Sequence, residues 1–133
     1  MTAPLSAVDH TLVAVPDLEV AAKFWRSLGF TLTPRAVHGG GATANNCIMF
    51  RDTYVELIAA TGDGASPLAA AIGARPPGGL GIAFATKDAA ATVQALRDAG
   101  VPTQDPLPLE RPLDLDGVAE TVRFENVLFQ ANL

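Results

Sequence analysis

The chain has 133 residues, of which 49% are hydrophobic and 17% charged, a balance typical of one globular domain that excludes a disordered chain. Its net charge of -5 argues against nonspecific binding to nucleic acid or to an anionic membrane, because both need a basic surface. Its one cysteine excludes an intrachain disulfide, and the sequence has neither a signal-peptide pattern nor an apolar run of membrane-helix length, so we expect a cytoplasmic protein.

The first strand and the first helix are predicted from residues 11–28. Thr11–Val15 is β-branched and apolar, which is typical of a buried strand. Asp17 is the expected N-cap of a helix over Leu18–Leu28, since its carboxylate can accept a backbone N–H of the first turn, and Gly29 is the expected C-cap. Apolar residues at fourfold spacing form one face of this helix: Val20, Phe24 and Leu28, with Ala21 and Trp25 beside them.

Further strands complete a β-α-β-β-β order in the first half. Short alternating or apolar runs predict them at residues 30–33, 46–50 and 53–59. His38–Ala42 is expected to be a loop because three of its five residues are glycine. Residues 61–79 begin and end in turn-forming clusters, and we expect a connector there with a short helix over Pro67–Ile72.

The second half is predicted to begin like the first. A buried strand, a helix and a long final strand are expected at Gly81–Thr86, Ala89–Ala99 and Val118–Leu128. Between the helix and the final strand, residues 101–112 are rich in proline and can hold at most an edge strand, because proline has no N–H for a sheet.

An internal repeat relates the two halves. Shifted by 71 positions, Asp9–Phe30 lies over Leu80–Val101 without a gap, and strand, aspartate cap, helix and glycine stop all coincide. The repeat predicts an α+β fold of paired βαβββ modules that enclose a cleft, the usual place for a ligand. We expect the first module at residues 1–60, a connector at 61–79 and a second module at 80–133 that lacks its last strand.

The sequence also resembles a known family. The resemblance is carried by Asp9-His10, Leu28-Gly29-Phe30, the loop at residues 38–45 and Tyr54-Val55-Glu56-Leu57-Ile58. These segments look like the glyoxalase-like branch of the vicinal oxygen chelate superfamily, the glyoxalase/bleomycin-resistance/dioxygenase type. The resemblance implies the paired βαβββ fold, often completed by dimerisation. Its members include metal-dependent lyases, isomerases, epimerases and dioxygenases, thiol transferases, and metal-free proteins that sequester drugs.

The resemblance implies metal ligands on the first and last strands of each module, which here are His10 and Glu56. One imidazole and one carboxylate suit Zn²⁺, Fe²⁺, Mn²⁺ or Ni²⁺. The repeat counterpart of His10 is Gly81, which has no side chain, and the strand for a fourth ligand is missing. Only two of the four usual ligands are therefore present, and a His10–Glu56 hydrogen bond without metal stays open as the alternative.

Other candidate site residues surround this pair in the sequence. His38 precedes three glycines, so its loop can approach a ligand; it is a candidate third metal ligand or general base, and Glu56 is the other candidate base. Asn45, Tyr54 and Arg123 are candidates for substrate binding, Arg123 through a substrate carboxylate. For these three, turn hydrogen bonds, packing and a solvated strand face are the competing interpretations.

Two functions follow from these features. The first is a metal-dependent lyase, isomerase or dioxygenase that acts on a small substrate with neighbouring oxygens. The second is a metal-free protein that binds a small molecule or drug. In both cases the expected partners are a small molecule and a second copy of the chain, since an unfinished sheet has an exposed edge, and neither nucleic acid nor a membrane is expected.

Overall fold

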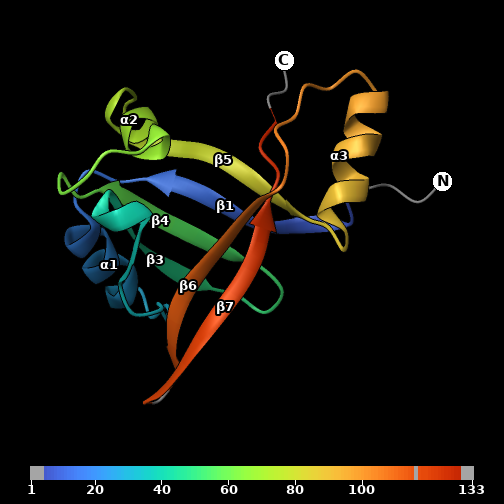
Figure 1. Cartoon of the computed structure of the whole chain (residues 1–133). Helices are drawn as coiled ribbons and strands as arrows, with labels where there is room; N and C mark the ends of the chain where they lie inside the picture. Colours follow the sequence, from blue (N-terminus) through green and yellow to red (C-terminus); the bar gives the residue numbers. More distant parts are fainter. Residues whose placement is uncertain (1–4, 116, 130–133) are drawn as a thin grey trace. The chain divides into compact units, whose positions relative to one another are not determined.

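A computed structural model describes residues 5–115 and 117–129 (Figure 1). The chain divides into two compact units, which are described separately: Val8–Phe84 is one, and Met1–Ala7 with Ala85–Leu133 is the other. The elements confirm a mixed α and β chain. Within the described residues, no helix is both long and apolar enough to span a membrane.

A five-stranded sheet forms the unit Val8–Phe84, with the strand order β2-β3-β4-β1-β5. The strands are β1 (Ala7–Ala14), β2 (Ala36–His38), β3 (Thr43–Met49), β4 (Tyr54–Ala60) and β5 (Gly78–Ala85) (Figure 1). β1 runs parallel to β4, whereas β3 pairs antiparallel with both β2 and β4. A short 3-10 helix, η1 (Gly39–Gly41), links β2 to β3.

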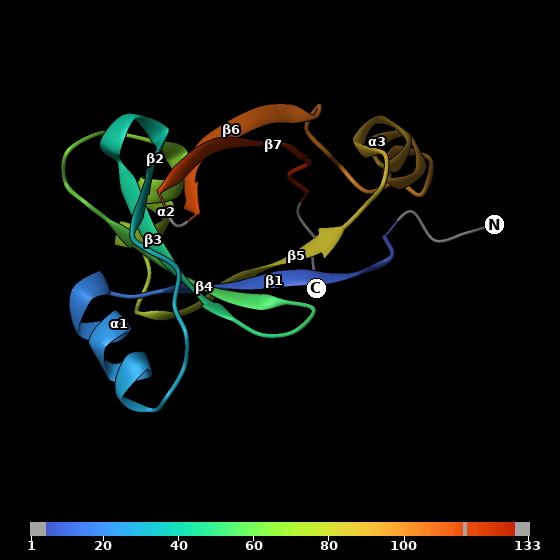
Figure 2. The ribbon, with the colours of Figure 1, turned by 90° about the horizontal axis from the view of Figure 1, so that it is seen from below.

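One face of this sheet packs against α1 (Leu18–Ser27), as Figure 2 shows. The core between them contains Leu18, Ala44, Ile48, Leu57 and Ala59, with Trp25 packed at its margin. The fourfold-spaced stripe predicted from the sequence does not face this core: Val20, Phe24 and Leu28 are 66%, 56% and 55% exposed. The helix packs instead through the face that carries Leu18 and Ala22, with Ala21 and Trp25 beside them.

The other face of the sheet carries polar residues. Residues paired directly across strands point to the same side, and the pairs His10–Tyr54, Cys47–Glu56 and His38–Thr43 therefore share this face. The helix α2 (Pro67–Gly73) begins at the N-cap Ser66. Its residue Ile72 packs with Ala14 and Ile58 in a second apolar cluster.

The second unit contains one helix and a two-stranded ribbon. They are α3 (Ala89–Asp98), β6 (Leu107–Leu115) and β7 (Val118–Asn126). β6 and β7 pair antiparallel from Leu107–Asn126 to Leu115–Val118. Each strand of a two-stranded ribbon keeps one unpaired edge, which explains how β6 accommodates Pro108 and Pro112.

The repeat predicted from the sequence is present in the elements. β1 and β5, like α1 and α3, begin and end 71 positions apart. The caps agree as well: Asp17 accepts the Val20 N–H at 3.0 Å and Asp88 accepts the Ala91 N–H at 2.9 Å. The prediction that the second module lacks its last strand stays a prediction, because it concerns residues beyond 129, which lie outside the described part of the chain.

The main difference from the predicted elements lies between α1 and β3. Residues 30–33 do not form a strand; only Leu32 pairs, in an isolated bridge to Ile48. The second strand lies instead at Ala36–His38, partly inside the predicted loop, and the glycines after it form η1. Gly40 and Gly41 have φ angles of 66° and 102°, which glycine adopts without strain and which allow this tight connection.

Candidate functional site

His10 and Glu56 meet on the sheet face opposite α1. His10 pairs with Tyr54 and Leu12 with Glu56 across β1 and β4, so both side chains point to the same side. Nε2 of His10 lies 3.3 Å from Oε2 of Glu56. The sequence prediction that these two residues form one site is therefore consistent with the geometry.

Glu56 is a buried carboxylate with two partners. It is 8% exposed, and burying a carboxylate is costly unless it is paired. His10 approaches one oxygen, and Asn45 Nδ2 donates a hydrogen bond to the other oxygen, Oε1, at 2.6 Å. Oδ1 of Asn45 is buried and has no hydrogen-bond partner among the described residues. This acceptor is therefore available to a donor from a ligand or from water.

The two members of the pair favour each other's charged form. Burial acts to lower the pKa of His10, but the hydrogen bonds and negative charges of Glu56 and Asp9 outweigh it and raise this pKa above its usual 6.5. Burial acts to raise the pKa of Glu56, but the hydrogen bonds from His10 and Asn45 and the charges of His10 and His38 lower it below its usual 4.5. A carboxylate beside an imidazolium is thus the state of the pair at mildly acidic pH.

The imidazole ring of His10 is held on three sides. Its Nδ1 lies 2.7 Å from Oδ2 of Asp9, opposite the nitrogen that faces Glu56. The ring of Tyr54 stacks on it, with centroids 4.4 Å apart and an angle of 12° between the planes. Asp9 was missed as a site residue by the sequence reasoning, although its position directly before His10 was a usable signal.

The arrangement of His10 and Glu56 fits a divalent metal ion. A nitrogen or oxygen ligand lies about 2.1 Å from the ion that it binds. If the ligand–metal–ligand angle is between about 90° and the tetrahedral value, the two ligand atoms lie about 3.0–3.4 Å apart. The 3.3 Å between Nε2 and Oε2 falls within this range. Each ligand also has an outer partner, Asp9 on His10 and Asn45 on Glu56, which is the usual support for histidine and carboxylate ligands.

Among residues 5–115 and 117–129, His10 and Glu56 do not belong to a larger group of possible metal ligands. Within the described residues, no group of three histidine, cysteine, aspartate or glutamate side chains is placed to hold one ion. His38 lies on β2, on the same sheet face as Glu56 but separated from β4 by β3, and it acts on Glu56 through its charge. The predicted roles of His38 as a third ligand and as a base both stay predictions.

Gly81 leaves space beside β1. β5 neighbours β1 in the sheet, and the Ser6 N–H donates to the Ala85 carbonyl at 3.0 Å, as an antiparallel pair of these strands requires. Continued along both strands without a bulge, this register places Gly81 opposite His10. A Cβ atom added at Gly81 would meet nothing within 4 Å.

The two residues that follow Asn45 have structural roles. Asn46 points to the α1 side, where its Nδ2 donates to the Thr33 carbonyl at 2.9 Å. The Cys47 N–H donates to Oγ1 of Thr33, and its thiol is buried. Together they attach the segment before β2 to β3, whereas the side chain of Asn45 donates a hydrogen bond to Glu56.

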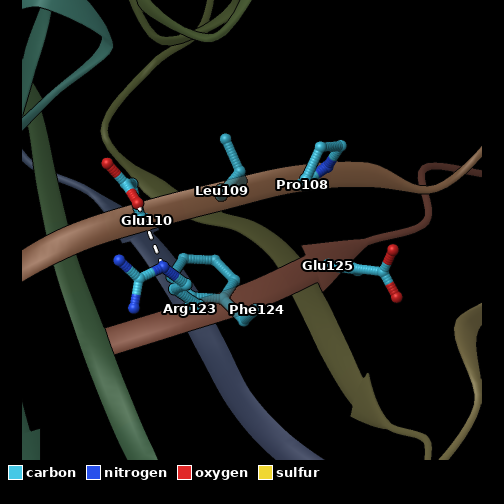
Figure 3. A pocket seen from close by; sticks show the side chains of 6 residues that line it. All are labelled: Pro108, Leu109, Glu110, Arg123, Phe124 and Glu125. Carbon is cyan, nitrogen blue, oxygen red and sulfur yellow. Dashed lines mark ion pairs between the residues drawn. The ribbon is translucent and has the colours of Figure 1, made fainter. Parts of the chain in front are cut away.

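Arg123 lies on β7, in the ribbon β6–β7 of the second unit. A hollow of about 530 Å³ is lined there by Pro108, Leu109, Glu110, Arg123, Phe124 and Glu125 (Figure 3). Arg123 Nε lies 3.3 Å from Oε2 of Glu110, and the Arg123 side chain is 74% exposed. An exposed ion pair of this kind contributes little to stability. Its predicted contact with a substrate carboxylate stays a prediction.

Comparison with known proteins agrees with this fold. The sequence model of a family described as glyoxalase-like domain matches residues 8–133. A search of curated proteins found no match. Similar solved structures include methylmalonyl-CoA epimerase from Mycobacterium tuberculosis, with 22% identity, 95% of this chain and 82% of that chain covered, and a TM-score of 0.68.

Two other solved structures extend this comparison. A Streptomyces coelicolor methylmalonyl-CoA epimerase variant, in complex with 2-nitronate-propionyl-CoA, has 23% identity, 90% and 96% of the two chains covered and a TM-score of 0.68. A hypothetical protein from Staphylococcus aureus has 16% identity, 94% and 53% covered and a TM-score of 0.73. Because the identities are low, these structures show the fold alone. The family match carries the identification: this chain belongs to the glyoxalase-like domain family, within the vicinal oxygen chelate superfamily that its sequence resembles.

Proposed function

We propose that this chain binds a divalent metal ion through His10 and Glu56 and acts, as an isomerase, on a small molecule with neighbouring oxygens. The observation that carries the proposal is the pair itself. Its nitrogen and oxygen are 3.3 Å apart, and Asp9 and Asn45 hold the far sides of the two groups. Zn²⁺, Fe²⁺, Mn²⁺ and Ni²⁺ all accept this set of donors.

The protein side chains have distinct roles in this proposal. When bound, the ion supplies Lewis-acid polarisation of a substrate carbonyl oxygen. Asn45 holds Glu56 by its amide and offers its buried Oδ1 to a substrate hydroxyl or N–H. Tyr54 fixes the His10 ring and lies at the edge of the site. His38, on the same face, is the proposed base that moves the proton of the substrate.

Isomerisation is the reaction class to test first among the lyase, isomerase and dioxygenase reactions. Several solved structures that share the fold are methylmalonyl-CoA epimerases. Epimerisation next to a carbonyl needs a base that removes the proton, a stabilised enolate oxygen and a proton donor on the opposite face of the carbon. In this proposal His38 is the base, a polarising ion stabilises the enolate oxygen, and water delivers the proton to the opposite face. Methylmalonyl-CoA is therefore the first probe, with other α-substituted thioesters and α-hydroxyketones after it.

Metal binding is tested first. The protein is purified without a histidine tag and titrated with Zn²⁺, Mn²⁺ and Ni²⁺ by calorimetry, with metal content measured by plasma mass spectrometry. We expect one ion per chain in wild type and a loss of affinity of at least about 100-fold in His10→Ala and Glu56→Ala, because each removes one of two protein ligands. Glu120→Gln, at an exposed position of β7, is the control. Equal affinity in all four proteins would refute the site.

The reaction is tested by hydrogen exchange at carbon. Each probe is incubated with metal-loaded protein in heavy water, and deuterium incorporation next to the carbonyl is followed by mass spectrometry. Wild type should incorporate deuterium, and His38→Ala should bind the same metal but exchange at least about 100-fold more slowly, since general base catalysis contributes on this scale. Metal binding without exchange of any probe would refute the isomerase proposal and leave the metal site intact.

A metal-free binding protein is the second candidate. Two observations favour this candidate. Gly81 lies beside β1 and has no side chain that could bind metal, and within residues 5–115 and 117–129 no third protein ligand joins His10 and Glu56. Here the His10–Glu56 ion pair and the Asn45 acceptor would bind a polar small molecule directly. Thermal-shift screening in the presence of a chelator separates the two candidates, because only this one keeps its ligand without metal.

We also propose that the protein forms a homodimer. β5 is the last strand in the order of the five-stranded sheet, and an uncovered sheet edge invites pairing with another chain. Light scattering at micromolar concentration should give twice the mass of 13.7 kDa. A monodisperse monomer would contradict this proposal.

A further inference from the structure

Asp9 contacts the nitrogen of His10 that faces away from Glu56. The Asp9 Oδ2 to His10 Nδ1 distance is 2.7 Å, and the His10 Nε2 to Glu56 Oε2 distance is 3.3 Å. Each ring nitrogen thus has its own carboxylate. A neutral imidazole carries one proton, and the nitrogen that binds a metal must be the other one. With one proton the ring can donate to only one carboxylate, and the contact with Asp9 is the shorter of the two, so the geometry favours the proton at Nδ1 and leaves Nε2 as the metal-binding atom.

We propose that Asp9 is a positioning residue that fixes the Nδ1–H tautomer and the orientation of the His10 ring. This inference rests on the proposed metal site, because it concerns one of its two ligands. It assigns Asp9 an effect on the site without a contact to metal or substrate. The sequence distinguishes Asp9 from an ordinary surface carboxylate only by its place directly before the histidine.

The backbone explains how adjacent strand residues can make this contact. Neighbouring residues of a strand normally point to opposite faces. The pairing of β1 with β4, however, begins at His10, opposite Tyr54, so Asp9 has no β4 residue opposite it. The Thr53 hydroxyl donates to the Asp9 carbonyl at 2.7 Å and fixes the backbone at this point. The Asp9 side chain is therefore able to reach the edge of the imidazole ring.

Asp9 and Tyr54 constrain the ring in different ways. Stacking on Tyr54 restricts the tilt of the imidazole plane, since the two planes are within 12° of parallel. It does not distinguish the two nitrogens, whereas the Asp9 hydrogen bond does. The Asp9 side chain is 48% exposed, so water competes for this hydrogen bond, and we expect an effect near the lower end of the 10- to 100-fold range known for outer-shell partners of metal ligands.

The experiment uses the full chain and three variants. Asp9→Ala removes the acceptor, Asp9→Asn keeps a neutral acceptor, and Asp52→Ala, in the exposed turn between β3 and β4, is the matched control. The tautomer of His10 is read from two-bond ¹H–¹⁵N correlations of the metal-free protein at a pH above the His10 pKa. The chain has two histidines, so a spectrum of His38→Ala assigns the signals. Zn²⁺ affinity is measured by calorimetry.

We expect wild-type His10 to be an Nδ1–H tautomer and Asp9→Ala to shift it toward the Nε2–H form, with a loss of Zn²⁺ affinity of about tenfold. Asp9→Asn should keep the tautomer, because its amide oxygen still accepts the hydrogen bond, and lose less affinity. Asp52→Ala should match wild type. Asp9→Ala with the wild-type tautomer, or with unchanged Zn²⁺ affinity, would overturn the inference. If wild type binds no metal, the proposed function fails, while the tautomer still decides the role of Asp9.

Discussion

Glu56→Gln tests the ion pair without changing the shape of the site. In the wild-type protein Asn45 Nδ2 lies 2.6 Å from Glu56 Oε1, and glutamine keeps a carbonyl oxygen there. Its amide NH₂, however, takes the place of Oε2, which faces His10. While His10 is protonated, two donors then face each other across 3.3 Å. The variant therefore loses one charge-assisted hydrogen bond, which is worth about 1.5–3 kcal/mol of unfolding free energy.

The cost depends on pH, and its sign follows from the two pKa values. The raised pKa of His10 stabilises the fold below its usual 6.5, and this contribution is lost as pH rises through the folded-state pKa. The lowered pKa of Glu56 stabilises the fold above its usual 4.5, and this contribution is lost as pH falls. Both contributions are present between these values. Above the His10 pKa the neutral Nε2 can accept from the glutamine amide, so the cost should fall below about 1 kcal/mol.

Urea unfolding of the metal-free protein at pH 5.5 and pH 9, with chelator present, measures this difference. Glu56→Gln should lose about 1.5–3 kcal/mol at pH 5.5 and clearly less at pH 9. The exposed control Glu120→Gln should change little at either pH. An equal loss at both pH values, or a larger one at pH 9, would refute the ion pair in the metal-free protein.

Three other predictions test the helix, the register and the metal site. Phe24→Ala, on the exposed side of α1, should cost less than about 1 kcal/mol of unfolding free energy, whereas Leu57→Ala in the core should cost about 2–5 kcal/mol. If urea unfolding gave similar costs for the two variants, α1 would have to pack through the face that carries Phe24. Gly81→His should raise the Zn²⁺ affinity measured by calorimetry at least about tenfold, because it adds a ligand opposite His10. Ile82→His should not, because its side chain points to the other face of the sheet; the reverse result would mean that the register is shifted by one residue. Zn²⁺ affinity should fall about tenfold per pH unit below the raised pKa of His10, because a proton must leave Nε2 first, and a pH-independent affinity would exclude His10 as a ligand.

The repeat was the feature that the sequence predicted best. Aspartate caps and glycine stops are local signals that depend on backbone hydrogen bonds, and these signals placed α1 and α3 correctly. The orientation of α1 could not be predicted in the same way. Val20, Phe24 and Leu28 form one apolar stripe, and Leu18, Ala21, Ala22 and Trp25 form a second at helical spacing. The helix packs through the second, and composition alone did not decide between them.

The sequence predicted the two central residues of the candidate site, His10 and Glu56, but not all of their contacts. Alternation along β1 and β4 was enough to place His10 and Glu56 on one face once the strands were known to pair. The contacts of Asn45 and Asp9 depend on register and on where pairing begins, and neither is encoded in a short sequence pattern. The strand at Ala36–His38 was missed because it lies beside three glycines, whose backbone conformation depends on the tertiary structure.

The repeat also supplies an internal comparison for the His10–Glu56 pair. β5 and α3 form at the same spacing as β1 and α1, with the same aspartate cap, although Gly81 stands where the first module has His10. A strand and helix of this kind therefore form without a histidine at that position. Burying a carboxylate and an imidazolium costs several kcal/mol in desolvation, and apolar residues of similar volume often serve stability as well or better. Since the fold does not require the pair and its burial is costly, the reason for its presence is best sought in what it binds.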